Sequence, residues 1–253
     1  MKKILVIIVL VLAAIAIISA SRNNPGAILS RIGADNLRGD SKELVYKVYL
    51  FGAVPAGEAV IADKGLDKFE GKNVYRLSAS AKGSNLISKI YPFEAALDSY
   101  LDPGTFLPLT FKQVLRTKDK ETVKEVSYDQ KSGIMRIADV KRTIFPETYE
   151  PLSALYKLRG MDLNSVPVFD LNINTNQKNY AFTGTINKEE LRLKNETVNI
   201  FRLKGKIFRR DKNPYHQSHL EIVFLDNPRK TPLSIKVFAS GALLTVRLTD
   251  TRL

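Results

Sequence analysis

The chain has 253 residues, of which 44% are hydrophobic and 26% charged, a composition typical of a globular protein and not of a disordered or fibrous one. It contains no cysteine, which excludes disulfides, thiolate metal sites and thiol nucleophiles. Its formal net charge of +13 favours polyanionic partners: nucleic acid for a cytosolic protein, and lipid headgroups or other anionic envelope components for an exported one.

The amino terminus has the layout of a secretory signal. Lys2 and Lys3 precede an uninterrupted apolar run over residues 4–18, and small residues follow at 19–21. This pattern predicts export of the rest of the chain, with no nucleic-acid partner. Cleavage after residue 20 and retention as a single-pass inner-membrane anchor both fit the run, with cleavage slightly favoured. We therefore expect a periplasmic protein that residues 4–20 bring close to the membrane.

Residues 21–40 follow as a segment rich in Asn, Gly and Pro, with little strand signal. This composition predicts a tether between the signal or anchor and the domain. No change in composition and no internal repeat appears after residue 40, so we expect one domain over residues 41–253.

Alternation of apolar and polar residues dominates that domain, which is the pattern of β-strands. Turn-forming clusters separate the strands at residues 63–65, 102–104, 129–133 and 226–230. The expected strands are Leu44–Leu50, Val74–Ala81, Leu107–Arg116, Thr122–Tyr128, Gly133–Val140, Val166–Asn174, Asn179–Ile186, Glu190–Leu193, Val198–Phe208, Leu220–Leu225, Pro232–Ala239 and Ala242–Thr249.

Two short helices interrupt this pattern. The segment Ser84–Ile90 is weakly helical, and Glu150–Arg159 more strongly so, because Pro151 suits the first helical position and Gly160 can end the helix. The second helix has one apolar face, formed by Leu152, Leu155, Tyr156 and Leu158.

These elements predict a mainly β fold: a single antiparallel curved sheet, either a half-barrel or a β-roll, with one short plug or lid helix, preceded by the amino-terminal signal or anchor helix. Several strands are apolar on both faces, as Val223 and Leu225 are opposite to Ile222 and Phe224. A sheet of this kind is either packed solidly or holds a ligand on its concave face, and solid packing is favoured.

Five ordered segments resemble a known family. They are residues 52–59, 99–109, 150–159, 228–235 and 241–248, and with them the chain resembles the bacterial family of domain of unknown function 3108 from about Lys42 to Thr251. The family usually has Asp before the helix proline, where this chain has Glu150. The resemblance implies an exported, β-rich envelope protein, and it assigns no catalytic residues.

No arrangement of residues typical of an enzyme emerges, so we expect no enzymatic activity, no cofactor and no metal. His216 and His219 fall on opposite faces of a strand, and zinc would need a third ligand. Ser153 lacks the Gly-x-Ser-x-Gly context of a hydrolase nucleophile. The carboxylate of Glu58 needs a partner or solvent, for which Arg76 and Arg159 are candidates.

One basic stripe is a candidate for contact with anions. Arg202, Lys204 and Lys206 alternate with apolar residues, so a strand would place all three on one face.

Two hypotheses of function follow. In the first, the concave apolar face binds an amphiphile such as a lipid or lipopolysaccharide, whose headgroup meets the basic stripe. Its ligand-binding residues would be Leu152, Leu155, Tyr156, Arg202, Lys204 and Lys206. In the second, the sheet is packed and binds protein or cell-wall partners of the envelope through its surface, without a small ligand. An open concave face would favour the first hypothesis, and a filled one the second.

Overall fold

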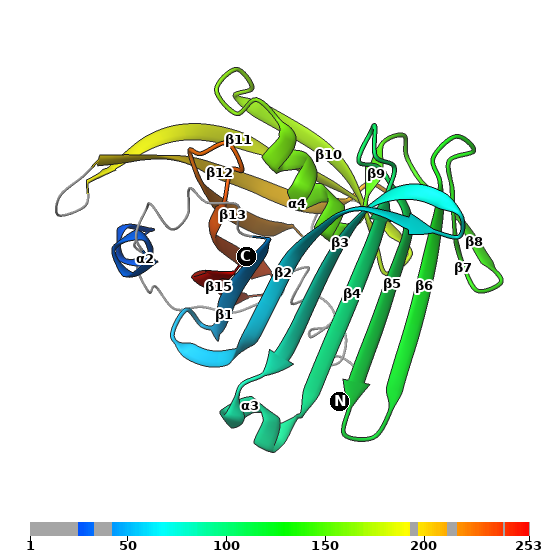
Figure 1. Cartoon of the computed structure of the whole chain (residues 1–253), viewed down its shortest axis with the longest axis horizontal. Coiled ribbons are helices and arrows are strands. Elements are labelled where there is room, and N and C mark those ends of the chain that lie inside the picture. The colour runs from blue at the N-terminus through cyan, green and yellow to red at the C-terminus, as the bar shows by residue number, and fades with distance from the viewer. Residues whose placement is uncertain (1–24, 33–41, 193–196, 212–216, 240, 253) are drawn as a thin grey trace.

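The computed structural model describes residues 25–32, 42–192, 197–211, 217–239 and 241–252. The strands among these residues form one curved fifteen-stranded sheet in the spatial order β8-β7-β6-β5-β4-β3-β2-β1-β15-β14-β13-β12-β11-β10-β9 (Figure 1). Neighbouring strands are antiparallel, except that β9 is parallel to β10. The predicted mainly β fold with a single curved sheet is confirmed.

The described elements have the following bounds. The strands are β1 (Glu43–Leu50), β2 (Val54–Phe69), β3 (Lys72–Gly83), β4 (Phe93–Leu101), β5 (Pro108–Thr117), β6 (Glu121–Asp129), β7 (Ile134–Ile137), β8 (Val140–Thr143), β9 (Thr148–Tyr149), β10 (Val168–Thr175), β11 (Lys178–Arg192), β12 (Thr197–Arg209), β13 (Ser218–Leu225), β14 (Pro232–Ala239) and β15 (Ala242–Arg252). The helices are α2 (Pro25–Ile32), α3 (Asn85–Ile90) and α4 (Pro151–Gly160).

The centre of the sheet is the pairing of the first strand with the last. Alternate residues of β1, namely Leu44, Tyr46 and Val48, are buried, as the period of a strand requires. Tyr46 lies opposite Leu248 of β15, and its hydroxyl donates a hydrogen bond to the carbonyl oxygen of Pro232 at 3.0 Å. Burial raises the pKa of this tyrosine, so it remains a neutral donor. One buried side chain thus ties β1 to the start of β14.

A close approach between β11 and β12 depends on glycine. Gly184 and Gly205 lie directly opposite each other in these strands. A Cβ atom on Gly184 would stand 2.2 Å from the carbonyl oxygen of Lys204, and a Cβ on Gly205 would stand 2.6 Å from the ring of Phe182. The rings of Phe169 and Phe182 pack edge to face at 4.7 Å. The two glycines therefore let these strands and rings pack without clashing.

Side-chain amides link the two ends of the sheet: Gln130 of the β6–β7 turn bonds to β9, and Asn172 of β10 and Asn179 of β11 bond to the region of β8. The Gln130 Nε2 donates to the carbonyl oxygen of Thr148 at 2.8 Å, and the Thr148 amide nitrogen donates back to Gln130 Oε1 at 3.3 Å. The Nδ2 atoms of Asn172 and Asn179 donate to main-chain carbonyls of the connection after β8 and of β8 itself. These carboxamides hold the two ends of the sheet together by side-chain hydrogen bonds, without strand pairing between β8 and β9.

The structure differs from the predicted elements at several places. Residues 63–65 form a bulge inside the long strand β2, where Gly65 has φ 73°, and not a turn. Strands β2 and β4 were not predicted, the expected strand Gly133–Val140 is the hairpin β7–β8, and the two strands expected between 179 and 193 are one continuous β11. Local turn residues misled the prediction, because pairing with long neighbours keeps β2 and β11 extended.

Helix α2 lies within the segment 21–40, where the sequence predicted no helix. Ile28 and Leu29 are buried, and the helix contacts β11, β14 and β15. Among the described residues, no helix has the length and apolarity needed to cross a membrane. The predicted signal or anchor, residues 1–20, lies outside the described part of the chain, as do the other residues of the predicted tether, 21–24 and 33–40.

Candidate functional site

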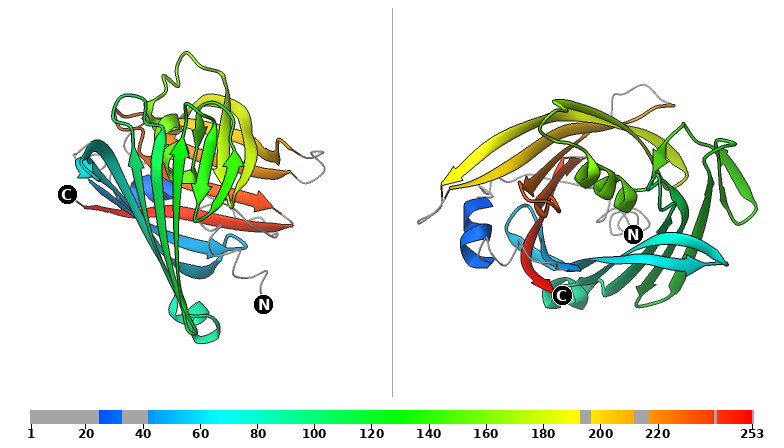
Figure 2. Two further views of the ribbon diagram at one scale, coloured as in Figure 1. Left: turned by 90° about the vertical axis from the view of Figure 1, so that its right-hand side faces the viewer. Right: turned by 45° about the horizontal axis from the view of Figure 1, so that its top comes forward.

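Helix α4 lies on the concave side of the sheet. Figure 2 shows it enclosed by strands from both halves of the sheet, β1–β8 and β9–β15. It contacts β3 and β4 on one side and β9 and β10 on the other. Leu152, Leu155 and Leu158 are buried in one core cluster together with residues of both halves of the sheet. The predicted helix thus fills the part of the concave face between these strands.

A buried carboxylate begins this helix. Glu150 is the N-cap, and its side chain accepts hydrogen bonds from the amide nitrogens of Leu152 at 2.7 Å and Ser153 at 2.6 Å. Ser99 Oγ of β4 donates to the same carboxylate at 2.7 Å, while the Glu150 amide donates to Ser153 Oγ at 3.0 Å. This capping box fixes α4 to the sheet and gives Ser153 a structural task.

Burial sets the protonation of Glu150. Desolvation raises the pKa of its carboxyl group above the usual value, against the opposing effect of the hydrogen bonds from Ser99, Leu152 and Ser153. The folded state therefore holds a proton over a pH range in which the unfolded chain releases it. In this range the contribution of Glu150 to the free energy of unfolding falls as pH rises.

We expect the stability of the wild type to fall, relative to that of Glu150→Gln, as pH rises from below the ordinary glutamate pKa to neutrality. Urea unfolding at a series of pH values measures this difference. Glu58→Gln, which removes an exposed carboxylate from β2, is the matched control. A gain in the relative stability of the wild type over the same range would contradict the raised pKa.

Polar side chains surround the carboxyl-terminal half of α4. The Arg159 guanidinium lies over the ring of Tyr156 at 4.4 Å, and its Nε donates to the carbonyl oxygen of Arg229 at 2.9 Å. On the facing strands, the Tyr75 hydroxyl donates to Asp63 Oδ1 at 2.6 Å. Burial and this hydrogen bond raise the pKa of Tyr75, and Arg159 and Tyr156 both lie within electrostatic range of it.

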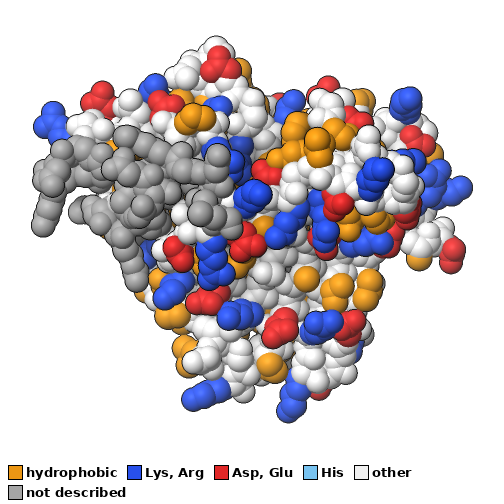
Figure 3. Space-filling view, in the orientation of Figure 1, with side chains coloured by type: hydrophobic (Ala, Val, Ile, Leu, Met, Phe, Trp, Pro, Cys, Tyr) orange, Lys and Arg blue, Asp and Glu red, His pale blue; other side chains and the backbone are white. Residues whose placement is uncertain are grey.

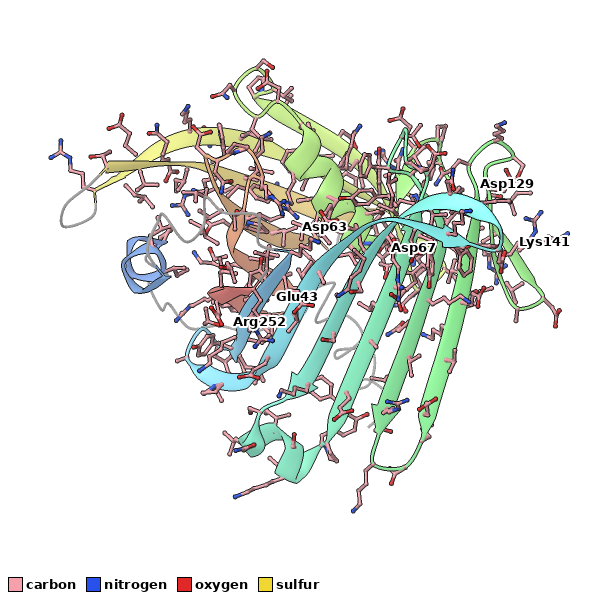
Figure 4. All side chains as sticks on the ribbon, viewed as in Figure 1. Glu43, Asp63, Asp67, Asp129, Lys141 and Arg252 are labelled. Atoms are coloured by element: carbon pink, nitrogen blue, oxygen red, sulfur yellow. The ribbon has the colours of Figure 1, made fainter. Side chains whose placement is uncertain are left out.

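These residues form what we call the tyrosine–arginine cluster: Asp63, Tyr75, Tyr156 and Arg159. Asp63, labelled in Figure 4, comes from β2, Tyr75 comes from β3, and the other two come from α4. All four are half-buried. The sequence analysis named Tyr156 as an apolar contact but did not foresee the other members. The signal available in the sequence was the turn-forming cluster at 63–65, which the structure shows to be the bulge that carries Asp63.

The basic stripe lies on β12. Alternation along the strand places Arg202, Lys204 and Lys206 on the face opposite to Phe201 and Leu203. The side chains of Lys204 and Lys206 are exposed.

Arg202 is held in ion pairs. Its guanidinium bonds to Glu189 at 2.8 Å and to Glu221 at 3.2 Å, and Lys236 bonds to Glu221 at 2.7 Å. The hydrogen bond that Arg202 donates to Glu189 raises the pKa of Arg202, in spite of its partial burial. The charges on the face shown in Figure 3 are similarly mixed, with acidic and basic side chains interspersed.

The remaining candidates have ordinary structural surroundings. Glu58 is exposed and pairs with Lys82 at 3.4 Å, so neither expected partner serves it: Arg76 pairs with Asp67 and Asp98, and Arg159 bonds to a main-chain carbonyl. His219 packs near Phe238, and His216 lies outside the described residues. Within the described residues, no group of three potential ligands has the spacing of a metal site.

A solved structure has a fold similar to this architecture. The chain resembles the β-barrel-like protein of domain of unknown function DUF1849 from Brucella abortus, with a TM-score of 0.52 and 9% identity over 83% of this chain and 96% of that chain. A DUF1089 family protein from Pseudomonas aeruginosa aligns with a TM-score of 0.39 and 7% identity over 69% of this chain and 87% of that chain. At these identities the first likeness shows the fold alone.

Sequence comparison identifies the family. A search among curated proteins gave no match. The sequence model of the family described as protein of unknown function (DUF3108) matches residues 45–248, which run from β1 to β15. The match covers almost the whole sheet, together with α3 and α4. The chain is therefore a member of the DUF3108 family.

Proposed function

We propose that the protein is an exported, non-enzymatic component of the bacterial cell envelope that works as a packed interaction module and binds its partners through its surface. The observation that carries this proposal is the position of α4. Leu152, Leu155 and Leu158 occupy the concave face and share one core with the sheet. The amino-terminal charge and apolar run support export to the periplasm, with or without cleavage.

The anchoring of α4 at both ends supports a permanent role in the core. Glu150 receives three hydrogen bonds at the first end, and Arg159 bonds to the main chain at the other. Moving the helix would break these contacts and expose its leucines, at about 0.8 kcal/mol for each methylene returned to water. The surface is then the part of the molecule that remains available for partners.

Native mass spectrometry with lipid extraction tests this proposal. The full chain is expressed with its own amino terminus in an outer-membrane bacterium and purified from the envelope. We expect a mass without stoichiometric lipid in its core after incubation with envelope lipids, and envelope partners captured by crosslinking in the cell. A stoichiometric amphiphile protected from extraction by the folded protein would contradict it.

An amphiphile carrier is the second candidate, favoured by the tyrosine–arginine cluster. Half-buried charge next to an apolar helix is suited to the headgroup of a lipid whose chain would take the place of α4. In this candidate Leu152, Leu155 and Tyr156 line the chain site, while Arg202, Lys204 and Lys206 meet anionic groups outside.

A reporter on α4 distinguishes the two candidates, because the chain has no tryptophan of its own. The variant Tyr156→Trp places one indole on the helix. A packed module predicts unchanged indole emission when lipid is added, because α4 stays in place. A carrier predicts a shift in emission that saturates at one lipid per chain.

The basic stripe has its own test. Lys204→Glu with Lys206→Glu is expected to weaken co-sedimentation with lipopolysaccharide aggregates, because two exposed cations become anions beside Glu221. Lys68→Glu with Lys72→Glu, exposed at the β2–β3 hairpin, makes the same change in net charge elsewhere. Equal sedimentation of the two variants would remove the stripe from the list of contact sites.

A further inference from the structure

Three connections lie together at one end of the sheet. The pairing of Gly57 with Gly83 places the β1–β2 turn beside α3, and the pairing of Phe93 with Thr117 places α3 beside the β5–β6 turn. Figure 1 shows these three connections along the lower end of the molecule. Turns from strands far apart in the sequence therefore form one surface.

This end exposes large apolar side chains. Ile90 and Leu86 of α3 are 82% and 55% exposed, Val123 of β6 is 63% exposed, and Phe51 and Val54 beside the β1–β2 turn are each 38% exposed. We call these five residues the apolar rim. Leaving such side chains in water is unfavourable, and a group of them on one surface indicates a site of interaction.

Lysines accompany the rim. Lys89 of α3 and Lys118 and Lys120 of the β5–β6 turn are exposed, and none of them makes an ion pair within the described part of the chain. In the space-filling view, hydrophobic side chains reach the surface beside basic ones at this lower end (Figure 3).

The acidic groups at this end are partly neutralised. Glu58 pairs with Lys82, Glu121 pairs with Arg116, and Glu94 lies within electrostatic range of Arg116. Asp119 lies near the ring hydroxyl of Tyr91 and raises its pKa, after the larger effect of burial. Because Arg116 is shared by two carboxylates and Asp119 has no ion pair among the described residues, Lys89, Lys118 and Lys120 leave this end with a small excess of positive charge.

The rim is fixed to the sheet. The amide nitrogen of Ser84, the N-cap of α3, donates to the carbonyl oxygen of Ala56 at 2.9 Å, and its hydroxyl donates to that of Pro55 at 2.8 Å. Ile87, on the inner side of α3, packs against the main core. Leu86 and Ile90 cannot fold back into the protein while this inner side is occupied.

We propose that the apolar rim docks on the surface of an anionic lipid bilayer. Aliphatic and aromatic side chains would enter the boundary between headgroups and acyl chains, and Lys89, Lys118 and Lys120 would face the lipid phosphates. The rim residues lie on α3 and beside two turns at one end of the sheet, an arrangement that suits a planar soft surface. This inference deepens the proposed surface role by naming an anionic membrane as the partner.

An introduced tryptophan tests the docking in the full chain. Ile90→Trp places an indole at the rim, and Leu66→Trp places one at a site 75% exposed near the opposite end of the sheet. Each variant is mixed with vesicles of phosphatidylcholine and phosphatidylglycerol in equal parts, some of which carry brominated acyl chains. We expect a blue shift and bromine quenching at residue 90, and neither at residue 66. This comparison holds whether or not the amino-terminal run also inserts, since both variants share it.

A second pair of variants tests how much the lysines contribute to vesicle binding. Lys118→Glu with Lys120→Glu, in the Ile90→Trp background, is expected to lower the apparent vesicle affinity at least about thirtyfold in the anionic mixture, because each lysine lost near the surface removes roughly 1 kcal/mol and each glutamate gained adds repulsion. It should have little effect in phosphatidylcholine alone. Added salt should weaken binding of the parent in the same way.

Two results would overturn the inference: an indole at residue 90 that stays unquenched in anionic vesicles, or equal quenching at residues 66 and 90. Crosslinking of residue 90 to a protein in cells, without quenching by lipid, would instead make the rim a protein interface. In that case the proposal of a packed interaction module would remain supported, and the proposal that it docks on a membrane would be wrong. A protected lipid in the core would contradict the module while leaving the rim experiment unaffected.

Discussion

Replacing Leu155 with glutamate is expected to abolish the folded state. Leu155 is buried on α4 within the main core. The variant loses the apolar contacts of leucine and buries a carboxyl group that has no hydrogen-bond partner. Together these changes should lower the free energy of unfolding by roughly 5 kcal/mol. This loss is comparable with the whole stability of a typical domain, which is about 5–15 kcal/mol. Far-UV circular dichroism and thermal unfolding of the purified variant measure the effect.

Two controls separate the burial of charge from other changes to α4. Leu155→Met keeps a similar volume and should cost less than about 1.5 kcal/mol. Lys157→Glu places the same acidic side chain on a half-buried position of the same helix, and the variant should remain folded. If the Leu155→Glu variant were folded and had the same Tm as the wild type, α4 would not be part of the core. The packed-module proposal would then lose its main support.

A single added methyl group at Gly184 should be almost as damaging. The Cβ atom of Gly184→Ala would stand 2.2 Å from the main-chain oxygen of Lys204 and 2.6 Å from the Cα of Gly205. Both neighbours are backbone atoms of the paired strand, so the clash is relieved by separating β11 from β12. We expect a loss of about 3 kcal/mol or more, with a fall in Tm of roughly 6–12 °C.

Gly160→Ala is the matched control, because no heavy atom lies near the position of its new Cβ. This residue ends α4, where alanine is a better helix former than glycine, so the control should be neutral or slightly stabilising. A Gly184→Ala variant as stable as this control would mean that the two strands lie farther apart than the structure places them. Differential scanning calorimetry of both variants decides the matter.

Much of the sheet was predictable from local sequence. The strand Pro232–Ala239 was predicted with its exact bounds, and Glu150 and Pro151 marked the start of α4 correctly. Strand β4 was missed because small and acidic residues such as Ala96 and Asp98 weaken its strand signal. It exists because β3 and β5 pair with it on both sides. The order of the fifteen strands depends on such long-range pairing, which no single segment encodes.

The candidate site was less predictable. Leu152 and Leu155 were correctly placed on the buried face of α4. The burial of Glu150 could not be inferred, because its partner Ser99 belongs to the strand that the sequence did not reveal. The tyrosine–arginine cluster likewise requires the bulge of β2 and the docking of α4. Polar groups that meet through tertiary packing leave no periodic signal in the sequence.

The pairing of β1 with β15 governs the order in which the protein can fold. The hydroxyl of Tyr46 and its acceptor on Pro232 are 186 residues apart, so the central seam of the sheet forms only after nearly the whole chain has been synthesised. The strands on either side of the seam are mostly joined by short hairpins and can assemble earlier as two separate halves. Until they meet, β1 and β15 each present an unpaired edge. A chain that folds in this way completes its structure last at the middle, and it is most prone to aggregate in the interval before its final strand arrives.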